Sequence, residues 1–324
     1  MRKIAVIGLG NITNRHRKNL KKIYPHSIIY AMSASGRIPT DEVSNADIVV
    51  NDICEIIDHR PDMAIVASPA TLHTKHAIPL IEAGIPVLIE KPLAANKLDT
   101  AAVIEAANKY KTPVAVGYCI RYLSSSKCMK VLLEEEIIGK VYNAFVEVGQ
   151  YLPDWRPNTD YLNSVSANLN LGGGALLELS HELDYAQWLF GSLQSHYAIL
   201  RSSEELSLEV EDAVDILATN EEGVVVSIHL DFLQRKAYRK CRIIGSKGSI
   251  EWDLIENEIT LTTASYKKVL FSEPEWDKNR MYLDMILDFE NLISGKDNQC
   301  ITLLEAKNTV SLIDHIKHSI TNKK

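Results

Sequence analysis

A short apolar run that ends in a glycine turn constrains the fold of this 324-residue chain more than any other feature. Residues 4–7 form the run, and Gly8 and Gly10 follow it directly. Glycine permits a tight turn and a close approach of the backbone to a ligand. A helix that begins just after such a turn offers unpaired N–H groups and the positive end of its dipole to phosphates. Strand, glycine turn and helix in this order predict a dinucleotide-binding site.

The glycine motif departs from the usual G-x-G-x-x-G at one position, because Thr13 replaces the third glycine. Asn11 and Ile12 lie inside the motif, and we count them with Gly8 and Gly10 as predicted cofactor contacts. The alternative is a glycine turn that only joins a strand to a helix. The context favours the cofactor site, since the motif follows a strand, opens a helix and lies in a βαβ pattern.

Short apolar runs alternate with helical patterns through residues 1–120, which we assign to an NAD(P)-binding domain. Continuous apolar strands separated by crossover helices are typical of a parallel sheet covered on both faces, the doubly wound Rossmann arrangement. Such sheets bind ligands at the carboxyl ends of their strands. We expect strands at 4–7, 27–32, 48–50, 63–67, 87–89 and 114–117, and helices at 14–23, 73–83 and 98–109.

Residues 121–324 follow a different pattern and form the predicted substrate-binding and oligomerisation domain. Turn-rich peptides join its strands, and hairpin connections of this kind build a large, mainly antiparallel sheet. One face of that sheet should pack on the domain's own helices and the other on a sister subunit, which predicts a homodimer or homotetramer. We expect strands at 141–149, 213–219, 224–230, 239–244, 249–253 and 259–263, and helices at 125–136, 175–190, 280–293 and 303–316, the last of which can pack back on the first domain.

Charge and cysteine content argue against several classes of function. The net charge of −7 and the lack of a Lys/Arg block make nucleic acid an unlikely partner. Five scattered cysteines without a Cys-x-x-Cys pair indicate reduced thiols in the cytoplasm rather than a disulfide framework or a zinc site. Five histidines lie in separate predicted elements without ligand-like spacing, so we expect no metal; they are His16, His59, His76, His196 and His229. No segment approaches the roughly 20 apolar residues of a membrane span.

The second strand ends without the acidic residue that holds the ribose 2′-hydroxyl of NAD in many such domains. Residues 32–37 read MSASGR, and no carboxylate occurs before Asp41. Two hydroxyls and an arginine suit a 2′-phosphate, so Ser33, Ser35 and Arg37 predict a preference for NADP over NAD. The alternative is a polar loop with an incidental arginine.

Two later strands place polar residues at the same edge of the sheet. Ser68, Pro69 and His73 follow the fourth strand and are predicted to lie near the nicotinamide or its ribose. Glu90 and Lys91 follow the fifth strand, where Glu90 can orient the lysine or line the ribose. A lysine transfers protons near neutral pH when desolvation and nearby positive charge lower its pKa from about 10.4. We therefore predict that Lys91 is catalytic and contacts cofactor and substrate, the alternative being a surface lysine after a strand.

In their order and spacing these pieces resemble the Gfo/Idh/MocA family, the glucose-fructose oxidoreductase and inositol dehydrogenase group, along nearly the whole chain. The resemblance implies a Rossmann domain followed by an α/β domain with a large, mainly antiparallel sheet. It also implies NAD(P)-dependent oxidation or reduction of a sugar-like carbon. The matching pieces are 8–13 with Arg15-His16, 68–73, 82–84, 90–93, 117–122, Trp155-Arg156, 172–174 with His181 and Asp184, 245–248 and Met281-Tyr282.

The resemblance further implies roles for residues outside the glycine motif. Lys91 would contact the reacting oxygen, and His181 would act as an acid, a base or a substrate ligand. Arg121, Trp155 and Arg156 would border cofactor and substrate. Together with Tyr161, the tryptophan and Arg156 suggest a substrate with a polar ring or an anionic group, because aromatic rings favour a sugar's apolar face and arginine favours carboxylate or phosphate.

One departure from the family pattern concerns the residues before His181. Many members carry an aspartate four residues before this histidine, whereas this chain has Leu177 there. Glu178 lies three residues before His181, and in a continuous helix residues i and i+3 share a face. We therefore predict Glu178 as a further catalytic residue. The alternative is a structural Glu178, with His181 acting with Lys91 alone.

Three functions stay open on this pattern. The leading hypothesis is a cytoplasmic NAD(P)-dependent dehydrogenase or reductase of a sugar, sugar derivative or nucleotide sugar, in which Lys91, directly or with His181, takes the proton of a substrate hydroxyl. The same resemblance includes glycosidases that use a tightly bound NAD as a transient oxidant. It also includes sensors that bind a dinucleotide without turnover, although the presence of Lys91 and His181 argues against a pure binder.

Overall fold

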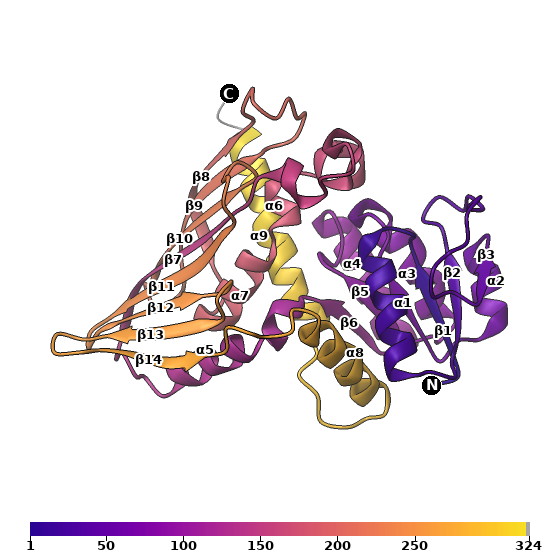
Figure 1. Ribbon diagram of the computed structural model, residues 1–324, viewed down its shortest axis with the longest axis horizontal. Coiled ribbons are helices and arrows are strands. Elements are labelled where there is room, and N and C mark those ends of the chain that lie inside the picture. Colours follow the sequence, from indigo (N-terminus) through magenta and orange to yellow (C-terminus); the bar gives the residue numbers. More distant parts are fainter. Residues whose placement is uncertain (322–324) are drawn as a thin grey trace. The chain divides into compact units, whose positions relative to one another are not determined.

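The computed structural model describes residues 1–321, and the chain divides into two compact units (Figure 1). The first unit contains residues Met1–Cys119 and Asn279–Val310. The second contains Ile120–Lys278 and residues 311–321. No helix within residues 1–321 has the length and apolar character needed to cross a membrane.

The first unit is built on a six-stranded sheet with the order β3-β2-β1-β4-β5-β6. All of its strand pairs are parallel, which requires a crossover connection between consecutive strands. The order reverses between β1 and β4, and a reversal of this kind marks the ligand-binding edge in doubly wound sheets. The strands are β1 (Lys3–Ile7), β2 (Ile28–Met32), β3 (Ile48–Val50), β4 (Met63–Val66), β5 (Val87–Glu90) and β6 (Val114–Gly117).

Helices of the first unit begin where the sequence supplies caps. The Asp52 side chain accepts a hydrogen bond from the N–H of Glu55, and the Asn96 side chain does the same for Asp99, so both satisfy an N–H that the helix leaves unpaired. Asn19 and Asn279 pair their side-chain amides, which ties the C-terminal segment to this unit. The helices are α1 (Asn11–Ile23), α2 (Ile53–His59), α3 (His73–Glu82), α4 (Lys97–Tyr110), α8 (Arg280–Ile293) and the first part of α9 (Leu303–Thr321).

The second unit is built on an eight-stranded sheet with the order β14-β13-β12-β11-β7-β10-β9-β8 (Figure 1). The β7–β10 pair is parallel, and the other six pairs that join its neighbouring strands are antiparallel. The strands are β7 (Val141–Gly149), β8 (Gln194–Arg201), β9 (Ala213–Thr219), β10 (Val225–Asp231), β11 (Tyr238–Gly245), β12 (Ser249–Asp253), β13 (Glu258–Thr262) and β14 (Lys267–Ser272).

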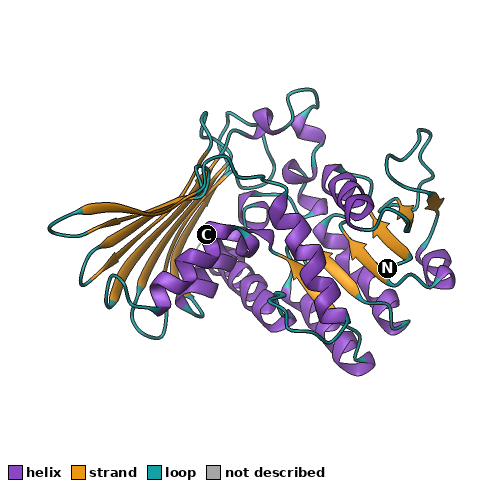
Figure 2. Cartoon of the chain, turned by 60° about the horizontal axis from the view of Figure 1, so that its bottom comes forward, coloured by secondary structure: helices purple, strands orange, loops and turns teal. Residues whose placement is uncertain are grey.

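The two faces of this sheet have different composition because side chains alternate along each strand. One face carries Val146, Ile228 and Trp252, which are fully buried. Helices α5 (Ser124–Glu134), α6 (Ala175–Glu178) and α7 (His181–Phe190) pack over this face, and Figure 2 shows helices gathered on one side of the strands. The indole N–H of Trp252 donates to Ser125 Oγ at 2.8 Å, so the buried ring leaves no polar atom unsatisfied.

The predicted fold class is confirmed: a doubly wound parallel sheet is followed by a large, mainly antiparallel sheet. The prediction of one helix over 175–190 is wrong, because α6 ends at Glu178 and α7 begins at His181. Leu179 leaves α-helical geometry with φ −97° and ψ 25°, and the N–H of Glu182 bonds to Leu179 O only three residues back. Three further elements, α2, β8 and β14, were not predicted from the sequence.

Candidate functional site

The turn between β1 and α1 has a geometry that only glycine accepts at its first position. Gly8 has φ +114°, and a β-carbon there would lie 2.6 Å from the carbonyl oxygen of Ala67. Its N–H donates to Met32 O at 2.7 Å, which anchors the turn to the end of β2. The turn is therefore set by the ends of β1, β2 and β4 together.

The N-terminus of α1 is open to a ligand. Gly10 is the N-cap residue, no side chain within residues 1–321 caps it, and a β-carbon at this position would have nothing within 4 Å. The first turn of α1 contains no acidic residue. Unsatisfied N–H groups, the positive end of the helix dipole and free space above a glycine fit the pyrophosphate of a nicotinamide dinucleotide. Asn11 and Ile12, both accessible to solvent, begin the helix at this point.

Thr13, which replaces the third glycine of the motif, is accommodated in the turn by one hydrogen bond and one close packing contact. Its hydroxyl donates to Gly10 O at 2.7 Å, which satisfies a polar group that is fully buried. Its methyl group lies where a β-carbon on Gly8 would come within 2.9 Å. The missing side chain of Gly8 therefore provides the room that the Thr13 methyl group occupies.

The loop after β2 carries the three residues predicted to hold a 2′-phosphate. Ile7 and Met32 are paired in the parallel register, so this loop starts beside the glycine turn. The hydroxyls of Ser33 and Ser35 lie 3.2 Å apart. Ser35 and Arg37 are exposed, so their polar groups are accessible to a ligand.

The residues after β4 form a buried hydrogen-bonded group. His73 places Nε2 2.8 Å from Ser68 O and Nδ1 2.9 Å from Pro92 O, so it links the loops that follow β4 and β5. Burial lowers the pKa of His73, while its hydrogen bonds to the Ser68 and Pro92 carbonyl oxygens act in the opposite direction. His76 Nδ1 lies 2.9 Å from Ser68 Oγ, and burial lowers the pKa of His76 to about 4. Pro69 is half-buried and begins the short turn that leads to His73.

Glu90, the last residue of β5, is paired with a histidine from α1. His16 Nε2 lies 2.6 Å from Glu90 Oε1, with the His16 side chain fully buried. Burial alone would raise the pKa of Glu90, but the hydrogen bond and charge of His16 and the charge of Lys91 outweigh it, so this pKa lies below its usual value. Gly117 on β6 provides the space, since a β-carbon there would lie 3.2 Å from the carboxyl group. Lys91 follows directly, is half-buried, and precedes Pro92 through a cis peptide bond.

A tyrosine from α8 completes the surroundings of this pair within the first unit. The Tyr282 ring meets the His16 ring edge to face, with centroids 6.1 Å apart, and the Arg15 guanidinium lies 4.6 Å from the centre of the Tyr282 ring. Burial raises the pKa of Tyr282, so its hydroxyl stays protonated. His16 and Tyr282 belong to the family resemblance, but no role was predicted for either residue from the sequence. The spacing of Thr13 and His16 on one face of α1 was the available signal.

Arg121 and Asp184 form a buried ion pair inside the second unit. Arg121 Nε lies 2.8 Å from Asp184 Oδ2, and its Nη2 lies 2.7 Å from Oδ1. Both side chains are less than one-tenth exposed, and the guanidinium carbon lies 5.5 Å from the centre of the Trp188 ring. Two donors of Arg121 therefore hold α7 to the short helix at Cys119–Tyr122.

Three predicted substrate residues line one cavity of the second unit. Trp155, Arg156 and Tyr161 lie on its wall, and its volume is about 260 Å³. Trp155 meets Phe232 edge to face with centroids 5.3 Å apart, and the Tyr161 hydroxyl donates to Leu206 O at 3.3 Å. The size suits a small polar ligand rather than a drug-sized one. The remaining lining residues are Leu152, Thr159, Asp160, Asn163, Ser164 and Ser166.

Glu178 and His181 lie on either side of the break between α6 and α7, so the i, i+3 argument for a shared helix face does not apply to them. Both side chains are half-buried, whereas Leu177 is buried in the core. Lys91 belongs to the first unit and His181 to the second. Within residues 1–321, no cluster of three or more His, Cys, Asp or Glu side chains has the arrangement needed to hold a metal ion.

Two family models match the chain. The model for an oxidoreductase family with an NAD-binding Rossmann fold matches residues 2–118, and the model for the GFO/IDH/MocA C-terminal domain matches residues 127–251. The chain belongs to the GFO/IDH/MocA family. As a GFO/IDH/MocA member with these two domains it is an oxidoreductase with an NAD-binding Rossmann domain.

Known proteins of similar sequence or structure align with nearly the whole length of this chain. It is 27% identical over 299 residues to myo-inositol 2-dehydrogenase of Thermotoga maritima, which covers 88% of this chain and 83% of that protein. A levoglucosan dehydrogenase solved with NADH and levoglucosan is 20% identical, with a TM-score of 0.85 over 100% of this chain and 98% of the other. UDP-N-acetylglucosamine 3-dehydrogenase of Acidithiobacillus ferrooxidans is 16% identical, with a TM-score of 0.78 over 98% and 97%. The two structural likenesses support the fold.

Proposed function

We propose that this protein is a dehydrogenase that transfers a hydride between NAD(P) and a hydroxyl-bearing carbon of a sugar, a sugar derivative or a nucleotide sugar. One observation carries the proposal. Lys91 follows the buried Glu90–His16 pair at the carboxyl end of β5, in the same sheet whose first strand ends in the open glycine turn. The names of similar proteins, an inositol and a levoglucosan dehydrogenase, support a sugar-like substrate.

The first unit binds the cofactor in this proposal. Gly8, Gly10, Asn11 and Ile12 hold the pyrophosphate with backbone N–H groups. Ser68, Pro69, His73 and Glu90 border the nicotinamide and its ribose, and Arg121 is a further proposed cofactor contact. The bound nicotinamide supplies or accepts the hydride.

Proton transfer belongs to Lys91 in this proposal. Its Nζ accepts the proton of the reacting hydroxyl, directly or with His181, and returns it in the reverse reaction. His16 keeps the Glu90 carboxylate charged. This carboxylate accepts a hydrogen bond from the backbone N–H of Lys91 at 3.2 Å, which restrains the backbone from which the Lys91 side chain extends. The rings of Trp155 and Tyr161 pack against the apolar face of a sugar, and the Arg156 guanidinium pairs with an anionic substituent.

The preferred cofactor in this proposal is NADP. Ser33, Ser35 and Arg37 provide two hydroxyls and a guanidinium at the end of β2, a position where no carboxylate is available. A titration with NADPH and NADH, followed by nicotinamide fluorescence, tests this. Tighter binding of NADPH, reduced in Arg37→Ala, is expected. Equal affinity for both cofactors would contradict the preference.

Two matched lysine variants test the catalytic assignment. Lys91→Ala should lower kcat by about 10²–10⁴-fold while the cofactor still binds, since this is the usual contribution of a general acid or base. Lys18→Ala removes an exposed lysine of α1 and should leave kcat unchanged. Loss of turnover in both His181→Ala and Glu178→Gln would assign both residues to the reaction; loss in His181→Ala alone would make Glu178 structural. Full activity of Lys91→Ala would overturn the proposal.

The cofactor content of the purified protein, together with the NAD(P)H concentration during turnover, distinguishes a dehydrogenase from a hydrolase that oxidises its substrate transiently. A dehydrogenase exchanges its cofactor and changes the NAD(P)H concentration during turnover. A dinucleotide that survives purification, combined with turnover at constant NAD(P)H, would replace the dehydrogenase by a glycosidase that uses bound NAD.

A homo-oligomer formed through the eight-stranded sheet is part of the proposal. Tyr197, Ile199 and Leu217 lie on β8 and β9 and are each more than two-fifths exposed. A second copy would cover these side chains. Light scattering that reports a monomer at micromolar concentration would contradict this. The five free cysteines fit the cytoplasmic location that we propose.

A further inference from the structure

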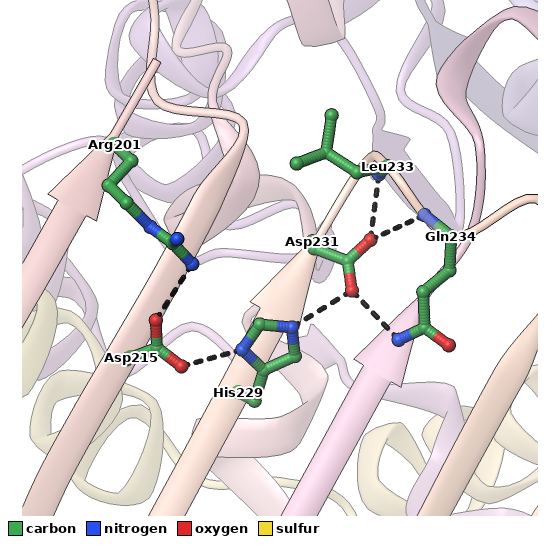
Figure 3. A network of polar contacts seen from close by, with 6 residues as sticks. All are labelled: Arg201, Asp215, His229, Asp231, Leu233 and Gln234. Carbon is green, nitrogen blue, oxygen red and sulfur yellow. Dashed lines mark hydrogen bonds and ion pairs between the residues drawn. The ribbon is translucent and has the colours of Figure 1, made fainter. Parts of the chain in front are cut away.

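A chain of polar contacts crosses three strands on the face of the eight-stranded sheet that lies opposite helices α5, α6 and α7 (Figure 3). His229 on β10 places Nδ1 2.6 Å from Asp215 Oδ1 and Nε2 3.0 Å from Asp231 Oδ2. Asp215 lies opposite His229 in the antiparallel register of β9, and Asp231 lies two residues farther along β10, so all three share a face. Arg201 on β8 donates to the other oxygen of Asp215 at 3.0 Å.

The imidazole of His229 needs both of its protons in this arrangement, because each ring nitrogen faces a carboxylate oxygen. The bond to Asp231 and the bond and charge of Asp215 outweigh desolvation and raise the pKa of His229 to about 9. Glu147, the register partner of His229 on β7, lies on the same face and is followed by Lys240 on β11. The charged groups along this row therefore alternate in sign.

Asp231 connects the network to the turn that follows β10. Its Oδ1 accepts from the N–H groups of Leu233 and Gln234, both at 2.7 Å, and its Oδ2 accepts from Gln234 Nε2 at 2.8 Å. The carboxylate is almost fully buried, and its pKa stays below the usual value because these donors and His229 outweigh burial. Gly149 on β7 makes room, since a β-carbon there would collide with Asp231 and Gln234.

The turn after β10 also contacts the residues that form one wall of the cavity. Phe232 follows Asp231 directly, is fully buried, and packs against the Trp155 ring. Its carbonyl accepts from the N–H of Leu152 at 3.0 Å, and Asp231 O accepts from the N–H of Gln150 at 3.2 Å. Trp155 Nε1 in turn donates to Gln150 O at 3.2 Å. Leu152 and Trp155 line the cavity, so two strand ends and one turn fix its wall.

We propose that Asp231, held by doubly protonated His229, is a positioning residue for the Trp155 wall of the cavity, so that loss of the His229 proton loosens ligand binding there. The ligand meant here is the sugar-like substrate, so this part of the inference rests on the proposed function. A neutral imidazole can donate from one nitrogen only. The lone pair of the other nitrogen then faces a carboxylate oxygen, and the two repel each other. Because Asp231 also holds the turn after β10, this repulsion strains the turn that contains Phe232.

A fluorescence titration that needs no substrate tests the coupling. Subtracting the emission of Trp155→Phe from that of the parent isolates Trp155, which is followed from about pH 7 to about pH 10.5. The Trp155 signal should change with a midpoint near 9, where His229 loses its proton. His229→Gln should abolish the change. Asp215→Asn should move the midpoint down by about one pH unit, because it removes one of the two carboxylates that hold the proton.

Asp215 is the decisive position because it contacts His229 and Arg201 but neither the turn nor Trp155. A purely structural role of the network would leave the midpoint unchanged in Asp215→Asn. An unchanged midpoint, or a Trp155 signal that stays flat over this pH range, would overturn the coupling. These readings stand whether or not the protein oxidises a sugar.

Kinetics test the consequence for ligand binding. Asp231→Asn keeps an oxygen for the N–H groups of Leu233 and Gln234 but loses the charge that holds His229. It should raise KM for the sugar substrate about tenfold while kcat changes less than about twofold. The substrate is positioned less well in the ground state, but the groups that take part in the reaction are unchanged. In the parent, KM should rise above about pH 9 and kcat should not. An unchanged KM in Asp231→Asn would overturn the role in binding.

Discussion

His16 Nε2 lies 2.6 Å from Glu90 Oε1 inside the first unit, and the two residues join the first turns of α1 to the last residue of β5. The glycine turn that suits a pyrophosphate and the strand end that carries Lys91 are thereby held by one hydrogen bond. The contact spans 74 positions of sequence, so no local pattern predicts it. Because of this hydrogen bond, the geometry at the end of β5 depends on the charge of Glu90.

Glu90→Gln should lower the free energy of unfolding by about 1.5–3 kcal/mol at neutral pH, the usual worth of a hydrogen bond to a charged group. The pKa of Glu90 is depressed in the folded state, so its contribution is present above the unfolded pKa of about 4.3 and is lost as pH falls through the folded value. Urea unfolding of parent and variant should therefore differ at pH 7 and converge in acid. Glu105→Gln, at an exposed position of α4, should cause no comparable loss.

Alanine at the two motif glycines should separate folding from cofactor binding. Gly8→Ala forces a β-carbon to within 2.6 Å of Ala67 O at φ +114°, so it should lower the melting temperature and cofactor affinity together. Gly10→Ala meets nothing within 4 Å and has φ −76°, so the fold should tolerate it. Its methyl group would nevertheless occupy the space above the helix end. We expect at least tenfold weaker NADPH binding with a melting temperature close to that of the parent; equal binding would place the pyrophosphate elsewhere.

Periodic features of the chain were predictable because they depend on neighbours in sequence. The parallel strands are continuously apolar, and the bounds of β7, β9 and β12 agree with those expected from alternation and turn residues. β14 was missed because its strand Lys267–Ser272 begins with two lysines and is mostly exposed at the edge of the sheet. Alternation is weak where one face of a strand has no core to meet.

Buried polar contacts were not predictable in the same way. Asp184 was named only as a part of the family resemblance, and its ion pair with Arg121, 63 positions away, was not predicted. The break after Glu178 has no proline or glycine to announce it, so a continuous helix was the reasonable expectation for residues 175–190. Such contacts depend on which side chains the sheet brings together, and that information is not local.

The Arg121–Asp184 pair should be costly to break. Both side chains are less than one-tenth exposed, and removing one partner leaves a buried charge, which typically costs 3–5 kcal/mol. Asp184→Asn should therefore destabilise the protein by about 3 kcal/mol in urea unfolding. Glu134→Gln breaks the exposed pair with Lys130 and should change stability by less than about 0.5 kcal/mol. Equal effects of the two variants would mean that the buried pair is not formed in solution.

The stability of the second unit should fall in alkaline solution through His229. A pKa raised from 6.5 to about 9 means that this contribution is fully present below the unfolded value and is lost as pH rises through the folded one. The side chain is about one-third exposed, so solvent screening reduces the contribution to about 1–2 kcal/mol. Urea unfolding should show parent and His229→Gln differing by this amount at pH 7 and converging near pH 10. A difference that stays constant between these two pH values would mean that His229 stabilises the sheet by packing and not by its charge.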